Sequence, residues 1–193
     1  MKYKKSFLTL FVVIFTLGIT ILNGFGFLWF GSTEKWKEEV KLGDGRTIIV
    51  ERKIEKERVA SERSLTGTFK PKEDYIWFTH PDGSGKMINW HTIKKSSMLF
   101  PEIPLILDLE NGQPVIYTLV GVGPGCEVYN KYIYRNGAWV EEALPEKFET
   151  RITNLLVKGR DIPKFVDLET KRKENEDSRR EVRQVGPTRK ICG

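Results

Sequence analysis

The sequence predicts an α+β fold, in which an N-terminal transmembrane helix precedes a small antiparallel β-rich domain with one packing helix. Three observations support this prediction. Residues 6–30 contain no ionisable side chain. Further along, four turn motifs each separate two strand-like segments. A later segment near residue 150 has apolar residues at helical spacing.

The apolar N-terminal segment follows a short tail, residues 1–5, that carries three lysines. As a helix rising about 1.5 Å per residue, residues 6–30 would cross a hydrocarbon core of about 30 Å. A basic start before an apolar run is also typical of a secretory signal peptide. We favour a retained anchor, because Trp29, Phe30 and Trp36 are placed like an aromatic belt at the far interface.

Charge predicts the topology and excludes one class of partner. The dense positive charge of residues 1–5 predicts a cytoplasmic tail, so residues 36–165 would form an extracytoplasmic domain of a single-pass inner (plasma) membrane protein. The net charge of +6 includes the three lysines of this tail. The remaining charges are interspersed and nearly balanced, so we expect no nucleic-acid binding.

Four hairpins are predicted within residues 36–165. Their turns are Gly43–Arg46, Pro81–Gly85, Glu110–Pro114 and Arg135–Gly137. The flanking strands are 39–42 with 47–50, 75–79 with 87–90, 105–109 with 115–120, and 129–134 with 138–140. Glycine, proline and asparagine in these turns suit the backbone angles that tight turns need, so the pattern predicts an antiparallel sheet.

Other segments give weaker signals. Residues 51–63 are highly charged and fit either a strand running into a charged helix or a mobile connector, and residues 66–72 are expected to form a polar loop. A closing helix is predicted from apolar residues at i, i+4, i+7 and i+8 after Pro145, namely Phe148, Ile152, Leu155 and Leu156. Residues 166–193 are rich in charge and are expected to be disordered.

Two glycine-rich segments resemble ligand-binding loops but lack essential positions. Gly83–Lys86 lacks the hydroxyl residue and the upstream glycine of a phosphate-binding loop, so a hairpin turn is expected. Gly121–Gly125 is followed by alternating residues instead of a helix, which predicts a turn or bulge. His80 and His91 would lie roughly 17 Å apart in the predicted hairpin, so no metal site and no cofactor are expected.

The chain has two cysteines, Cys126 and Cys192. They could form one disulfide in an oxidising compartment, but an unpaired or intermolecular cysteine is an equal alternative because Cys192 lies near the end of a polar tail. Cys126 lies in the glycine-rich turn, where a dyad with His91 would make it a reactive thiol. This dyad defines an alternative function, a Cys126-dependent hydrolase or redox protein.

Aromatic side chains provide the leading candidate site. If strand alternation leaves them on a solvent face, Trp77, Trp90 and Tyr134 would form a binding surface for a peptide, a glycan or a lipid headgroup.

The order of motifs also suggests a family. After the apolar segment come Trp36–Val40, Asp44–Arg46, Pro104–Asp108 and Tyr134–Trp139. This pattern resembles small uncharacterised bacterial proteins that are exported or membrane-anchored, and the resemblance implies no activity. We therefore expect a non-enzymatic binding or scaffolding module of the cell envelope, with the membrane and an envelope protein as its partners.

Overall fold

A computed structural model describes residues 31–61, 64–96, 98–123, 126–144, 152–157 and 162–177. The chain divides into two compact units: one comprises residues 1–32 and 57–69, and the other comprises 33–56 and 70–193. In the smaller unit, residues 57–61 and 64–69 form the ends of two long strands.

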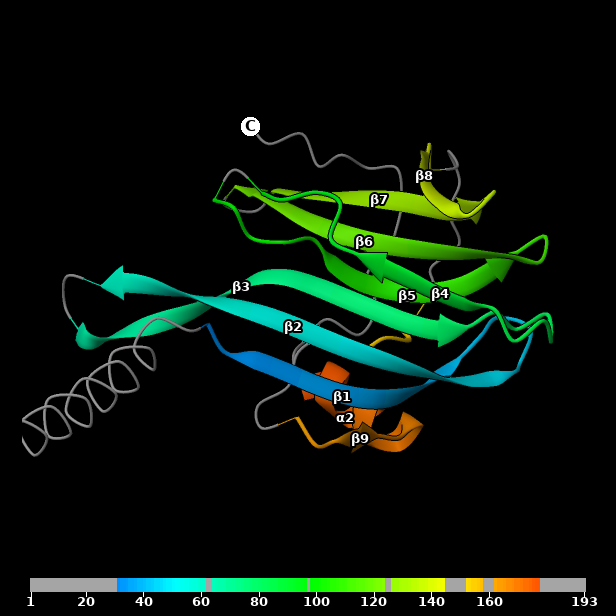
Figure 1. Cartoon of the computed structure of the whole chain (residues 1–193), viewed down its shortest axis with the longest axis horizontal. Helices are drawn as coiled ribbons and strands as arrows, with labels where there is room; N and C mark the ends of the chain where they lie inside the picture. The colour runs from blue at the N-terminus through cyan, green and yellow to red at the C-terminus, as the bar shows by residue number, and fades with distance from the viewer. Residues whose placement is uncertain are drawn as a thin grey trace, which may run out of the picture. The chain divides into compact units, whose positions relative to one another are not determined.

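The first sheet has the strand order β4-β3-β2-β1-β9 (Figure 1). Its strands are β1 (Thr33–Lys41), β2 (Thr47–Ser61), β3 (Ser64–Thr79), β4 (Met87–His91) and β9 (Phe165–Val166). β1 pairs antiparallel with β2, and β3 pairs antiparallel with β4. β9 lies parallel to β1 and brings the end of the domain back to its beginning.

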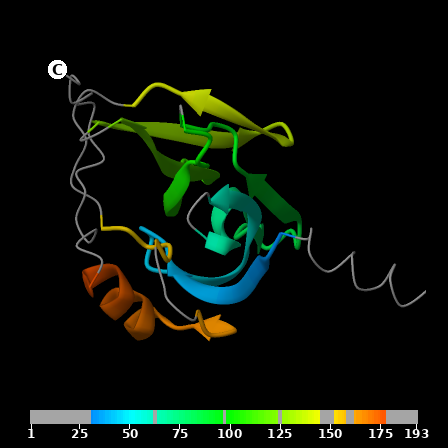
Figure 2. The same ribbon diagram turned by 90° about the vertical axis from the view of Figure 1, so that its left-hand side faces the viewer.

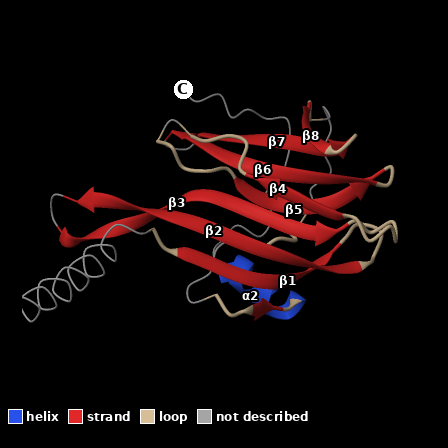
Figure 3. Ribbon diagram, in the orientation of Figure 1, coloured by secondary structure: helices blue, strands red, loops and turns tan. Residues whose placement is uncertain are grey.

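The second sheet is an antiparallel meander with the order β5-β6-β7-β8 (Figure 3). Its strands are β5 (Ile103–Glu110), β6 (Gln113–Gly123), β7 (Cys126–Arg135) and β8 (Ala138–Glu142). The one helix among the described residues, α2 (Leu168–Asp177), follows β9.

All four predicted hairpins are confirmed. The turn between β7 and β8 shows why the local signal was sufficient. Asn136 and Gly137 have φ angles of 52° and 86°, the left-handed conformation that a two-residue hairpin turn requires and that asparagine and glycine adopt most readily. The glycine-rich segment is also confirmed as a bulge, since the pairing of β6 with β7 shifts register between Gly121 and Gly123.

The core lies between the two sheets (Figure 2). One cluster of buried side chains draws on both sheets and on residue Leu155; its other members are Val40, Leu42, Val50, Ile76, Phe78, Ile88, Trp90, Leu107 and Ile116. A second cluster lies on the opposite face of the four-stranded sheet and is centred on Tyr117 and Leu105. Burial of these apolar surfaces is the main favourable term for folding.

The predicted α+β fold is wrong, because the described residues are mostly β, with two sheets and one short helix. Of the segment where the closing helix was predicted, the structure describes residues 152–157, which are irregular, while Phe148 lies outside the described residues. Of the predicted apolar stripe, Ile152 is 71% exposed, whereas Leu155 and Leu156 are buried, but in different clusters. Their backbone N–H groups donate to Leu105 O and to the Glu38 carboxylate, so these donors are satisfied without a helix.

Two further expectations are corrected. β3 begins at Ser64, so the polar loop at residues 66–72 is part of a strand, and residues 51–61 belong to β2. Residues 168–177 form α2 although the tail was expected to be disordered. This helix is almost entirely polar, and polar side chains hold it against the domain.

The prediction of a transmembrane helix as part of the fold is also corrected. Across the residues that the structure describes, no helix is long and apolar enough to cross a membrane. The predicted tail at residues 1–5 and the predicted anchor at residues 6–30 lie outside the described residues. The same holds for residues 178–193, the rest of the charged tail.

Candidate functional site

Alternation along the strands of the first sheet separates two sets of polar residues. Arg52 and Asp74 are buried, whereas their neighbours Lys53 and Tyr75 are only partly buried. Successive side chains in a strand point to opposite faces, so each strand supplies one set to the interior and the other to the outer face. The outer face holds the candidate site.

Tyr75 and Trp77 form the centre of this outer face. They are two residues apart on β3, and their rings stack with centroids 5.5 Å apart and planes within 2° of parallel. Lys53 Nζ lies 3.7 Å from the centroid of Tyr75 and 5.6 Å from that of Trp77. A cation over an aromatic face is attracted by the ring quadrupole, so Lys53 from β2 helps to hold both rings.

Acidic groups surround the Tyr75 end of the pair. The Tyr75 hydroxyl donates to Glu55 Oε2 at 3.4 Å, and Lys53 Nζ forms an ion pair with Glu55 at 2.7 Å. Burial raises the pKa of Tyr75 to about 12, and the carboxylates of Glu73 and Glu55 add to the effect. Tyr75 therefore stays neutral at physiological pH and acts as a packing and hydrogen-bonding group.

The Trp77 end opens onto a basic groove of about 670 Å³. Its lining residues are Lys35, Trp36, Lys37, Glu51, Arg52, Lys53, Trp77, Met87 and Lys164. Met87 is 62% exposed, which leaves an apolar side chain in solvent beside an indole. Arg52 is already paired with the buried Glu38 and Asp74. The other charged residues of the lining are four lysines and one glutamate, so the groove has a net positive charge.

The three aromatic residues predicted to form one binding surface do not lie together. Trp77 lines the groove. Trp90 is fully buried in the core, since it pairs with Ile76 and not with Trp77 across β3 and β4. Tyr134 is partly buried on β7, where its ring centroid lies 5.3 Å from that of Trp139.

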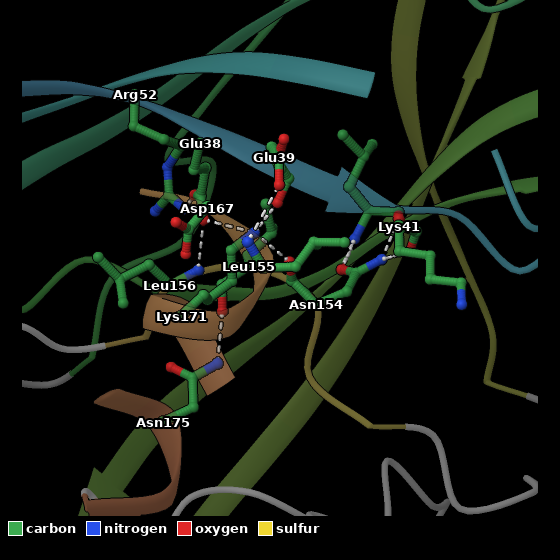
Figure 4. A network of polar contacts seen from close by, with 12 residues as sticks. Glu38, Glu39, Lys41, Arg52, Asn154, Leu155, Leu156, Asp167, Lys171 and Asn175 are labelled. Atoms are coloured by element: carbon green, nitrogen blue, oxygen red, sulfur yellow. Dashed lines mark hydrogen bonds and ion pairs between the residues drawn. The ribbon is translucent and has the colours of Figure 1, made fainter. Parts of the chain in front are cut away.

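The buried set of polar residues forms an ionic network beneath α2 (Figure 4). Arg52 lies between Glu38 of β1 and Asp74 of β3, with ion pairs of 2.8 and 2.9 Å. Glu38 Oε2 also pairs with Lys171 Nζ at 2.9 Å and accepts the Leu156 N–H at 2.9 Å. The network thus pairs two buried cations with two buried carboxylates.

Burial and pairing compete at each member of this network. Burial raises the pKa of Asp74, and Arg52 opposes that rise. Burial acts against the charge of Arg52, but the carboxylates of Asp74 and Glu38 outweigh it and raise the pKa of Arg52. Burial lowers the pKa of Lys171, and Glu38 opposes that fall.

A second pocket, of about 570 Å³, lies beside α2. Its polar lining includes Lys171, Asn154 and Asn175, which Figure 4 shows pointing into the network. Lys171 donates to Asn154 O at 2.8 Å, Asn154 Nδ2 to Lys41 O at 3.0 Å, and Asn175 Nδ2 to Leu155 O at 3.1 Å. Because these groups bind the protein's own backbone, the basic groove is the stronger candidate for binding a ligand.

The predicted reactive thiol is only partly described. Cys126 is the first residue of β7 and pairs with Gly123, while its side chain and Cys192 lie outside what the structure describes. His91 ends β4 in the other sheet, with Nδ1 3.3 Å from Glu73. The dyad and the disulfide therefore stay predictions. Within the described ranges, no group of three potential metal ligands is found.

The sequence contained part of the signal for the observed site. Tyr75 shares the face of Trp77 because they are two residues apart, and the turn at residues 80–86 sets Trp77 opposite Asn89, which sends Trp90 to the interior. The lysines could not be found in this way. Lys35 of β1 and Lys53 of β2 pair with each other and meet Trp77 only through the assembled sheet.

Comparison of the chain with family models, with curated proteins and with solved structures found no match.

Proposed function

We propose that the protein is a non-enzymatic binding module that holds an acidic segment of a partner protein in the basic groove beside Trp77. The observation that carries this proposal is the gathering of lysines around two apolar side chains, the partly buried Trp77 and the exposed Met87. These lysines are Lys35, Lys37, Lys53 and Lys164.

The charges of the groove favour an anionic ligand. Lys37 pairs with Glu51 at 2.8 Å, and both side chains are more than half exposed, so a competing carboxylate could exchange into this pair. Within the part of the chain that is described, no carboxylate lies within ion-pair distance of Lys35 or Lys164. Cations of this kind at the rim of a site steer an acidic partner toward it.

The apolar side chains favour a polypeptide ligand over an inorganic anion. Trp77 is held by Tyr75 and Lys53, so it can contact a ligand without first losing much side-chain freedom. Tryptophan is enriched among the residues that contribute most to protein–protein binding. A segment with one apolar residue between acidic residues would contact Trp77 and Met87 as well as the lysines. An envelope protein, as the sequence predicts, is one source of such a segment.

A defined probe tests the proposal with the full-length protein. The probe is a fluorescein-labelled peptide with glutamates on both sides of one leucine, and binding is followed by fluorescence anisotropy. We expect Trp77→Ala to weaken binding by about tenfold, the loss of one well-placed anchor. Lys35→Gln combined with Lys164→Gln should also weaken it, and added salt should reproduce that effect.

Two controls sharpen the result. Lys173→Gln removes one positive charge from α2, where Lys173 pairs with Glu169, and should leave binding unchanged. A peptide with lysines in place of glutamates should not bind. Equal affinity of wild type and Trp77→Ala for the acidic peptide would contradict the proposal, as would binding of polygalacturonate, an anionic glycan, in preference to the peptide.

A further inference from the structure

The loop between β4 and β5 carries a second exposed feature, independent of the groove. Its tip presents consecutive bulky apolar side chains: Met98 is 63%, Leu99 62% and Phe100 41% exposed. Single exposed apolar residues are common on proteins, but a contiguous exposed group marks an interaction site.

The tip has a defined shape because the loop closes on itself. Lys95 and Pro101 form an isolated antiparallel bridge at its neck. Ser96 N–H donates to Phe100 O at 2.8 Å, Phe100 N–H donates to Ser96 Oγ at 3.0 Å, and Leu99 N–H donates to Ser96 O at 2.9 Å. These bonds hold the apolar side chains on a convex turn.

A buried carboxylate fixes the base of the loop to the domain. Glu102 Oε1 accepts the N–H groups of Ile93 and Lys94 at 2.7 and 2.9 Å. Its Oε2 accepts the hydroxyls of Thr118 and Tyr132, at 2.6 and 3.0 Å, from the second sheet. Glu102 is therefore turned inward, and its two carboxylate oxygens accept four hydrogen bonds within the domain.

The backbone conformation of Leu99 is energetically unfavourable for a leucine. Its φ of 61° lies in the left-handed region, which glycine and asparagine adopt far more readily than leucine. The side chain does not recover this cost by burial, since most of it is in solvent. A leucine at this position is better explained by a contact made outside the chain.

Cations flank the tip. Lys70 Nζ from β3 lies 5.9 Å from the centroid of Phe100, and Lys95 is exposed at the neck of the loop. Long lysine side chains can reach phosphate groups while apolar neighbours enter the acyl boundary. We propose that this loop inserts Met98, Leu99 and Phe100 into the interfacial region of an anionic lipid bilayer. The contact is peripheral and requires no membrane-spanning helix.

A convex apolar tip fits a deformable lipid surface, which needs no preformed complementary pocket.

Methionine methyl NMR tests the proposal on the full-length protein. The chain has three methionines, so methyl-¹³C labelling gives separate signals for the tip residue Met98, for Met87 in the groove and for Met1. Bicelles of phosphatidylcholine and phosphatidylglycerol containing a 5-doxyl lipid broaden signals from methyl groups that enter the bilayer. We expect strong broadening of the Met98 signal and little change at Met87. Broadening of both alike, or of neither, would overturn the proposal.

One substitution separates insertion from a structural role. Leu99→Asn suits the left-handed backbone and removes the apolar side chain, so it should preserve or increase the stability of the fold. It should nevertheless reduce the broadening at Met98 several-fold. Lys70→Gln with Lys95→Gln should reduce it in bicelles that contain phosphatidylglycerol. Unchanged broadening in Leu99→Asn would overturn the proposal; so would an apolar protein partner that binds the tip while bicelles leave Met98 sharp.

Discussion

Arg52 and Lys53 are neighbours on β2 and carry the same charge, but they work under opposite conditions. Arg52 lies in the interior with both of its carboxylate partners buried, whereas Lys53 lies on the outer face beside Tyr75 and Trp77. Asp74 and Tyr75 repeat this contrast on β3.

The contrast shows how a strand can combine stability with binding. A buried charge must have all its partners within the fold, because removing one leaves an ion in a poorly solvated site. On the outer face, water can replace a lost partner, so side chains there can exchange their contacts for those of a ligand. Four predictions test this division, in order of decreasing effect.

Removal of the central cation should have the largest effect. Arg52→Met leaves Glu38 and Asp74 buried without their main partner, and we expect a loss of about 3–5 kcal/mol in the free energy of unfolding. Lys53→Met on the adjacent position should cost less than about 1 kcal/mol. Urea unfolding of both variants measures the difference. Equal losses would show that the burial of Arg52 does not make it more important for stability than Lys53.

Lys171 connects α2 to the same network, and its removal should have the second-largest effect on stability. Lys171→Met removes the ion pair to Glu38 but leaves Glu38 paired with Arg52. We therefore expect a loss of about 2–3 kcal/mol in the free energy of unfolding and faster amide exchange throughout α2. Lys173→Met removes only an exposed pair with Glu169 and should cost about 0.3–0.5 kcal/mol. If both variants left α2 equally protected, polar anchoring of the helix would be disproved.

On the outer face, Tyr75→Leu should have a smaller effect on stability. The substitution removes the stack with Trp77 and the contact with Lys53, at a cost of about 1 kcal/mol. The loss in the free energy of binding to the acidic peptide should exceed the loss in the free energy of unfolding, because Trp77 loses the neighbour that holds its ring. Stability comes from chemical denaturation and affinity from anisotropy. Weaker folding with unchanged affinity would mean that Trp77 does not depend on its neighbour.

The smallest effect concerns the N-terminus of α2. The carboxylate of Asp167 accepts the Thr170 N–H at 2.7 Å, and this bond holds the pKa of Asp167 below its ordinary value of 3.8. A carboxyl group with a lower pKa in the folded state stabilises that state above the unfolded pKa and loses this contribution as the pH falls through the folded pKa. The Thr170 amide shift should therefore change in acid, and Asp167→Asn, which retains an acceptor, should remove the change. An identical titration in the variant would contradict this assignment.

Local chemistry explains which parts of the fold could be predicted. The hairpin with Asn136 and Gly137 depends on two residues whose backbone preferences are intrinsic, and the bulge at Gly121 is similarly local. The spacing of Leu155 and Leu156 correctly indicated burial but not a helix, because the carbonyl of Leu105 and the carboxylate of Glu38 compete for their N–H groups. Neither partner is near them in sequence.

The candidate site divides in the same way. Alternation on β3 is enough to place Trp77 beside Tyr75, and antiparallel register is enough to bury Trp90. The lysines of the groove come from several segments, and only assembly of the sheet brings Lys35 and Lys164 toward Trp77.

Local sequence is sufficient to specify the turns, the strands they connect and the alternation of each strand, since these depend on backbone preferences over a few residues. Tertiary structure decided that Arg52 is an internal ion and Lys53 a surface one, that a polar tail segment becomes α2, and that distant lysines share one groove. Long-range pairing decides such features, because the free energy of a charge depends on which groups, or how much water, the completed fold places around it.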